Sequence, residues 1–131
     1  MIKLKPLQSF FIFIAYFLVL IFLAEPQFIH YNVAGSYSPI TNNIMIYPDK
    51  ATDLDDYLNT ATHEYGHYIF DELFNDSQRK EWIEEYNNFD YHITTYAKTN
   101  YQEGFAENYK MYKVHNYTPY SVRVMLKIIG E

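Results

Sequence analysis

Two histidines and a glutamate stand close together in the stretch THEYGHYIF, residues 62 to 70. His63 and His67 are four residues apart, so on a helix both imidazoles lie on one face and can bind the same metal ion. Glu64 would point about 100° further around such a helix, beside the metal rather than bonded to it. A general base must lie there to take a proton from a zinc-bound water. The spacing therefore predicts zinc-dependent hydrolysis, provided that a third ligand exists.

A third ligand distinguishes this site from a helix that carries two histidines by chance. The glycine and further histidine of a metzincin are absent, because Phe70 stands three residues after His67 and the next histidine is His92. The stretch YAKTNYQEGFAENY, residues 96 to 109, offers glutamates instead. Glu103 and Glu107 are four apart on one face of a predicted helix, so one can bind zinc while the other orients a ligand histidine. The alternative is that both acids face solvent.

Gly104 argues against that alternative. A glycine inside a helix costs about 1 kcal/mol relative to alanine. Its presence is more easily explained where two helices approach closely. The chain thus carries two independent halves of a His, His, Glu site.

These two stretches resemble the metallopeptidase family of anthrax lethal factor and the bacterial Pro-Pro endopeptidases. The shared pattern is HExxH, then a tyrosine, a glutamate seven residues on, and a second glutamate in an ExFAE run. Here it reads HEYGH, followed by Tyr96, Glu103 and Glu107. The resemblance covers roughly residues 35 to 112 and implies a small zincin-like domain of the gluzincin type that hydrolyses peptide bonds. The chain is much shorter than the toxin, so the cleaved sequence does not follow from the resemblance.

The resemblance also assigns roles to individual residues. It implies that one zinc ion (Zn2+) is bound by His63, His67 and Glu103. Glu64 becomes the general base, and Tyr96 assists the transition state, for which its hydroxyl could donate to the developing oxyanion. Glu107 would hold a ligand histidine from outside the coordination sphere.

A β-hairpin is predicted ahead of the histidine helix. The stretch FIHYNVAGSY, residues 28 to 37, carries β-formers, the turn-rich SPITNN follows, and IMIY, residues 44 to 47, predicts a second strand. A glycine within the first strand, Gly35, indicates a bulge or a close backbone approach. By the family resemblance, this strand lies along the active-site cleft and supplies the substrate-binding residues Gly35, Ser36 and Tyr37.

Four helices are predicted after the hairpin. We expect them at about residues 53–73, 77–86, 100–114 and 118–130. Their caps are expected at Thr52 or Asp53, Asp76 or Ser77, Asn100 and Thr118. The apolar positions of the first helix recur every three or four residues, at Leu54, Leu58, Ala61, Tyr65, Ile69 and Leu73. The fold class is therefore α+β, a β-hairpin followed by about four helices.

An apolar segment precedes the predicted domain. Two lysines within the first five residues are followed by an unbroken apolar run from Phe10 to Ala24. Counted from Leu7, the segment has about 18 residues, enough to span a bilayer. Residues 1–24 are therefore predicted to be a signal peptide or an uncleaved signal anchor. The positive-inside rule then places residues 25–131, the zinc metallopeptidase domain, outside the cytoplasm, either membrane-anchored or secreted after cleavage.

The amino-acid composition of residues 25–131 limits the kinds of partner that this part of the chain can bind. This part holds all 16 acidic residues and 8 of the 10 basic ones, so its net charge is −8. It offers no basic stripe for a phosphate backbone, which makes nucleic acid an unsuitable partner. The chain has no cysteine, so a metal rather than a disulfide could brace so small a domain.

The sequence favours a zinc endopeptidase that acts on a peptide or protein outside the membrane. One alternative is a non-catalytic, zinc-stabilised domain that binds a protein partner, although such a site has no need of Glu64. A membrane scaffold is a third possibility, and it leaves both motifs unexplained. The remaining histidines receive no role: His30, His92 and His115.

Overall fold

The computed structural model describes residues 34–131, which form a small α+β domain. As predicted, a β-hairpin is followed by four α-helices. The hairpin consists of β1 (Gly35–Ser38) and β2 (Asn43–Ile46), and a 3-10 turn, η1 (Pro48–Lys50), follows it. The helices are α2 (Leu54–Tyr68), α3 (Asp76–Asn87), α4 (Tyr101–Lys113) and α5 (Tyr120–Ile129). A π-helical segment, η2 (Ile69–Leu73), extends α2.

The hairpin pairs in a regular antiparallel register, with Gly35 opposite Ile46. The second strand begins and ends one residue earlier than predicted, and residues 28–33 of the predicted first strand lie outside the described residues. Gly35 marks a close approach rather than a bulge. A Cβ at Gly35 would lie 2.6 Å from Thr60 Cγ2 and 3.1 Å from Glu64 Cγ, so glycine lets β1 lie directly against α2.

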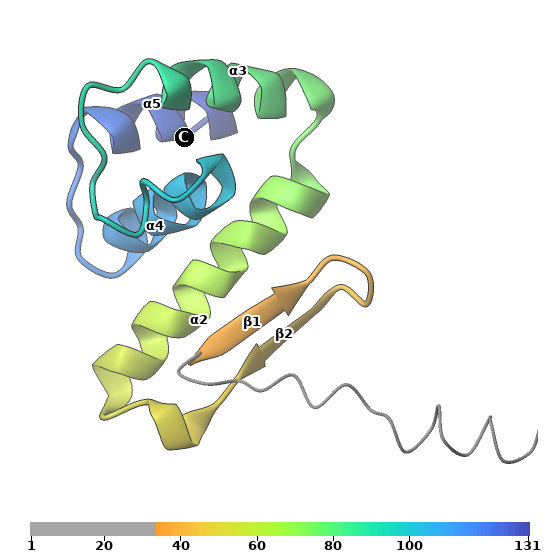
Figure 1. Cartoon of the computed structure of the whole chain (residues 1–131), viewed down its shortest axis with the longest axis vertical. Helices are drawn as coiled ribbons and strands as arrows, with labels where there is room; N and C mark the ends of the chain where they lie inside the picture. Colours follow the sequence, from red (N-terminus) through yellow and green to blue (C-terminus); the bar gives the residue numbers. More distant parts are fainter. Residues whose placement is uncertain (1–33) are drawn as a thin grey trace, which may run out of the picture. The chain divides into compact units, whose positions relative to one another are not determined.

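Helix α2 lies between the hairpin and the group formed by α3, α4 and α5 (Figure 1). It packs most extensively against α4. At their crossing, a Cβ on Gly66 would come within 2.7 Å of Ala106 Cα, so only glycine permits this distance between the helices. Gly104 serves a similar purpose for α3, because the Tyr86 ring rests where its Cβ would be. The close approach predicted at Gly104 is therefore present, and a second one occurs at Gly66.

Helix α4 is the most buried element of the described region. All residues from 104 to 109 are buried, including two polar ones. One of these, Asn108, accepts a hydrogen bond from Ser121 Oγ at 2.6 Å and donates to the Gly104 carbonyl at 2.7 Å. The apolar core beside α4 is formed by Phe70, Phe74, Trp82, Tyr86, Phe105, Tyr109, Val122, Met125 and Ile128. This core fixes α4 firmly against its neighbours.

The predicted apolar stripe of α2 is not its buried face. Leu54 is 70 % exposed and Leu73 57 % exposed, and none of the stripe residues between them is fully buried. The helix instead buries the side that carries the two-histidine motif, together with Phe70. The stripe correctly predicted a helix, but the side of α2 that packs against α4 and β1 carries the polar motif.

The observed cap residues of the helices match the predicted ones or lie one residue away from them. Asp53 caps α2 and Asn100 caps α4, as predicted, each accepting backbone N–H bonds at 2.9 Å. The cap of α3 is Asn75, one residue before the predicted position, because it forms a reciprocal capping box with Gln78. Helix α5 has Pro119 at its cap, so the predicted side-chain cap at Thr118 is absent.

The predicted membrane segment, residues 1–24, lies outside the described residues. Among the helices of residues 34–131, none is long and apolar enough to cross a membrane.

Candidate metal centre

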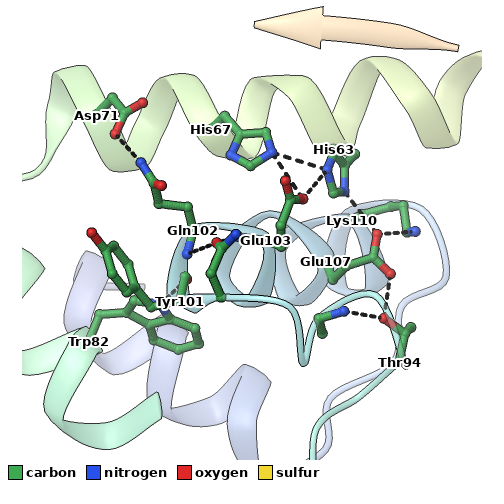
Figure 2. Close-up of polar contacts among 12 residues, drawn as sticks. His63, His67, Asp71, Trp82, Thr94, Tyr101, Gln102, Glu103, Glu107 and Lys110 are labelled. Carbon is green, nitrogen blue, oxygen red and sulfur yellow. Dashed lines mark hydrogen bonds and ion pairs between the residues drawn. The ribbon is translucent and has the colours of Figure 1, made fainter. Parts of the chain in front are cut away.

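Two helices bring three donor atoms together. His63 and His67 extend from α2 toward Glu103 at the start of α4 (Figure 2). His63 Nε2 lies 3.1 Å from His67 Nε2 and 3.0 Å from Glu103 Oε2, and His67 Nε2 lies 3.3 Å from the same oxygen. Within residues 34–131, this is the one group of three such side chains whose donor atoms converge closely enough to hold a metal ion.

The geometry of these three atoms fits zinc. A tetrahedral zinc ion with bonds of about 2.0–2.1 Å to nitrogen and oxygen has ligand atoms about 3.3 Å apart. The three separations here are 3.0 to 3.3 Å. Two neutral imidazoles and one carboxylate are a common catalytic zinc set, which leaves a fourth position open.

Glu107 contacts His63 from the side away from these atoms. Its Oε1 lies 2.8 Å from His63 Nδ1. An ionised carboxylate only accepts hydrogen bonds, so Nδ1 carries a proton, and Nε2 is the nitrogen that faces His67 and Glu103. Glu107 is itself held by the Lys110 ammonium and by Thr94 Oγ1, which donates to Oε2 at 2.8 Å (Figure 2).

The charges of the site favour a cation at its centre. Burial alone lowers the pKa of His63, but its hydrogen bonds to Glu103 and Glu107 outweigh burial and raise that pKa to about 9. Burial raises the pKa of each carboxyl, but hydrogen bonds, chiefly from His63, hold both at about 2. Carboxylates that stabilise a proton on the histidine stabilise a metal cation in the same place.

Glu64 lies beside these ligands, on the side of α2 that faces β1. It is 8 % exposed, and Tyr37 of β1 donates a backbone hydrogen bond to it. Burial raises its pKa, an effect that the neighbouring histidines partly offset. A carboxylate with a raised pKa near a cleft suits a group that must both accept and release a proton.

Tyr96 belongs to the connection between α3 and α4. Its ring centroid lies 5.6 Å from that of His63, and 53 % of the residue is exposed. Partial burial and the negative charge of Glu103 raise the pKa of Tyr96 to about 12. The hydroxyl therefore stays protonated at neutral pH and remains a hydrogen-bond donor.

The candidate ligands open onto a cavity of about 320 Å³. The residues predicted from the sequence to bind substrate or act in catalysis line it as well: Gly35, Ser36, Tyr37, Glu64 and Tyr96. A neighbouring hollow of about 360 Å³ shares Gly35, His63, Glu64 and Tyr96 with it and continues toward Lys110. The site therefore stands partway along a groove rather than at its end.

The Tyr37 side chain in this groove is tied to η2, the π-helical extension of α2. Its hydroxyl donates to Glu72 Oε1 at 3.1 Å. Partial burial and this carboxylate raise the pKa of Tyr37 to about 12. The phenol thus stays neutral at the rim of the cavity.

Sequence reasoning missed two residues that contact Glu107. Lys110 lies one helical turn after it, a spacing that could have been recognised as an ion pair. Thr94 comes from an irregular connection, where no periodicity points to a partner. Of the histidines without a role, His92 packs against the Tyr86 ring at a tilt of 46°, and His115 Nε2 lies 2.7 Å from Asn59 Oδ1. His30 is outside the described residues.

Comparison with protein-family models, with curated proteins and with solved structures yields no match. The described region holds a His63, His67 and Glu103 cluster, carried by two helices, that could hold a metal ion.

Proposed function

We propose that this chain is a zinc-dependent endopeptidase of the gluzincin type. One observation carries the proposal: the donor atoms of His63, His67 and Glu103 converge in the wall of a cavity that also contains the buried Glu64 carboxyl. A zinc ion that only braces the fold has no need of a carboxyl in this position. The groove extends to both sides of the ligands, which suits a chain cut away from its ends.

The residues divide the work of hydrolysis among them. When bound, zinc would polarise the peptide carbonyl and lower the pKa of the attacking water to about 7. Glu64 accepts the proton of that water and later passes it to the leaving nitrogen. The Tyr96 hydroxyl donates a hydrogen bond to the carbonyl oxygen as it becomes negative. Glu107 keeps His63 in the tautomer whose Nε2 faces the metal.

Substrate would lie along β1. The family resemblance supports this placement, and the cavity lining of Gly35, Ser36 and Tyr37 agrees with it. The preferred substrate is an extended stretch of peptide or protein.

A peptide library tests the proposal directly. We expect the full chain, loaded with one equivalent of zinc, to cleave internal bonds of a subset of peptides, as read by mass spectrometry. Stripping zinc with a chelator should stop cleavage, and reloading should restore it. Zinc binding without cleavage of any peptide would instead support the protein-binding alternative.

Removal of the Tyr96 hydroxyl is expected to slow turnover. Tyr96→Phe should lower kcat by about 10- to 1000-fold, because one hydrogen bond to the developing oxyanion is lost. The melting temperature should change little, since the residue is half-exposed. Parental kcat in this variant would assign Tyr96 to packing alone.

We further propose that the domain acts outside the cytoplasm. The two lysines ahead of the apolar segment support this orientation. A protease added to intact cells should therefore degrade a tag placed after residue 131, while a cytoplasmic control protein survives. Full protection of the tag, with no protein in the medium, would show the opposite orientation.

A further inference from the structure

Tyr96 lies in an irregular connection, residues 88–100, that joins α3 to α4. No helix or strand positions this stretch, so contacts of its own side chains must hold it in place. A catalytic hydroxyl requires accurate placement, because small displacements of a reacting group reduce rates strongly. The contacts that hold Tyr96 are therefore as important as the residue itself.

Thr94 supplies two of these contacts through one hydroxyl. Its Oγ1 donates to Glu107 Oε2 at 2.8 Å and accepts the Ala97 N–H at 2.9 Å. The second bond closes a short turn that contains Tyr96. The first bond ties that turn to α4.

The turn is fixed on its other side as well. Ala97 is fully buried, and its carbonyl accepts a hydrogen bond from the Tyr86 hydroxyl of α3 at 3.1 Å. Thr94 Oγ1 is thus the point where the turn meets the carboxylate that also contacts His63 Nδ1.

We propose that Thr94 is a positioning residue, which sets the place of the Tyr96 hydroxyl relative to the metal ligands by joining the Tyr96 turn to Glu107. The contacts run from the turn through the Thr94 hydroxyl to Glu107, and from Glu107 to His63 (Figure 2). The inference rests on the proposed function, because it gives Tyr96 a role in turnover. It also has a consequence for metal binding, since Thr94 is a donor to the carboxylate that orients His63.

The adjacent threonine provides a matched control. Thr95 has the same side chain in the same turn, but it is exposed, and its hydroxyl makes no hydrogen bond to another described residue. Only its carbonyl is used, as acceptor of the Lys98 N–H at 3.3 Å. Thr95→Val therefore repeats the chemical change of Thr94→Val without breaking either contact.

The test compares turnover at saturating zinc in the full chain. Thr94→Val should lower kcat by about 10- to 100-fold with little change in KM. Thr94→Ser keeps the hydroxyl and should restore turnover close to the parental value, and Thr95→Val should behave as the parent. If Thr94 acts through Tyr96, the double variant Thr94→Val, Tyr96→Phe should have a kcat only about twofold below that of Tyr96→Phe alone.

Zinc affinity gives a second measurement that does not depend on cleavage. Competition with a chelating indicator should show weaker binding, by about 10-fold, in Thr94→Val but not in Thr95→Val or Tyr96→Phe. If Thr94→Val fails to fold, Thr94→Ala takes its place in the same comparison. Parental kcat and parental zinc affinity in Thr94→Val would overturn the inference. So would a double variant in which the kcat losses of Thr94→Val and Tyr96→Phe multiply fully. A parental chain that cleaves no peptide would instead refute the proposed function.

Discussion

Glu64→Gln is expected to lower peptide hydrolysis by about 10²- to 10⁴-fold, the usual contribution of a general base. Glutamine has nearly the same shape but cannot accept the proton of the attacking water. Zinc content should be unchanged, because the three donor atoms belong to other residues. The measurement is kcat on a cleaved peptide, with zinc determined in the same sample.

The stability of this variant should not fall. In the metal-free protein, burial raises the pKa of Glu64, so folding disfavours the ionised form of this carboxyl. A neutral amide removes that cost, and the melting temperature should stay at or slightly above the parental value. Lost activity in a well-folded, zinc-loaded variant would therefore be chemical in origin.

A remote glutamate serves as control for this substitution. Glu84→Gln changes an exposed residue of α3 whose side chain, among residues 34–131, forms an ion pair with Lys80 alone, one turn earlier. Its turnover should equal that of the parent. Parental activity in Glu64→Gln would show that Glu64 is not the base.

Sequence reasoning succeeded where the physical cause is local. The caps at Asp53 and Asn100 satisfy backbone N–H groups within three residues, so their identity can be recognised in a short window. The four-residue spacing of the histidines places both on one helical face for the same reason. The spacing of two glutamates on a later helix then supplied candidates for the third ligand, and the structure brings Glu103 to that position.

The buried face of α2 could not be predicted in this way. Its apolar stripe indicated one side, and the structure buries the other. Gly66 offered a usable signal, because a small residue inside a helix commonly marks a close approach. Its partner, Ala106, is 40 residues away along the chain, and neither residue by itself identifies the other.

The contacts that support the site were also beyond sequence reasoning. Thr94 meets Glu107 across 13 residues of irregular chain and the start of a helix. No periodicity, helix cap or sequence motif in such a stretch indicates which residue a threonine will contact. The position of the Tyr96 turn depends on tertiary packing, and so do the residues that hold it.

Removal of zinc is expected to unfold the domain at a much lower temperature as well as to abolish cleavage. The candidate ligands come from α2 and α4 and are separated by about 35 residues, so a bound ion would link the two helices. No disulfide braces the chain, which contains no cysteine. In a domain of this size the free energy of unfolding is a small difference between the gain from burial and the cost in chain entropy. One such link therefore supplies a large part of it.

The size of the effect follows from mass action. An ion that binds the folded chain but not the unfolded one stabilises it by about 4 kcal/mol at a thousandfold excess over its Kd. Since 1 kcal/mol shifts the melting temperature of a domain of this size by about 4–8 °C, chelation should lower it by tens of degrees. Calorimetry or circular dichroism, with and without chelator, measures the shift.

Variants assign this zinc-dependent shift to individual residues. Glu103→Ala removes a candidate ligand and should abolish most of the shift. Glu107→Ala removes the partner of His63 Nδ1 and should weaken zinc binding by about 10- to 100-fold, leaving a smaller shift. Glu84→Ala, on the exposed side of α3, should keep the parental shift.

A melting curve that does not respond to chelator, from protein first shown to contain one zinc ion, would contradict the coupling between the metal and the fold. The reason is that an ion held by both helices must stabilise the state in which the two helices meet.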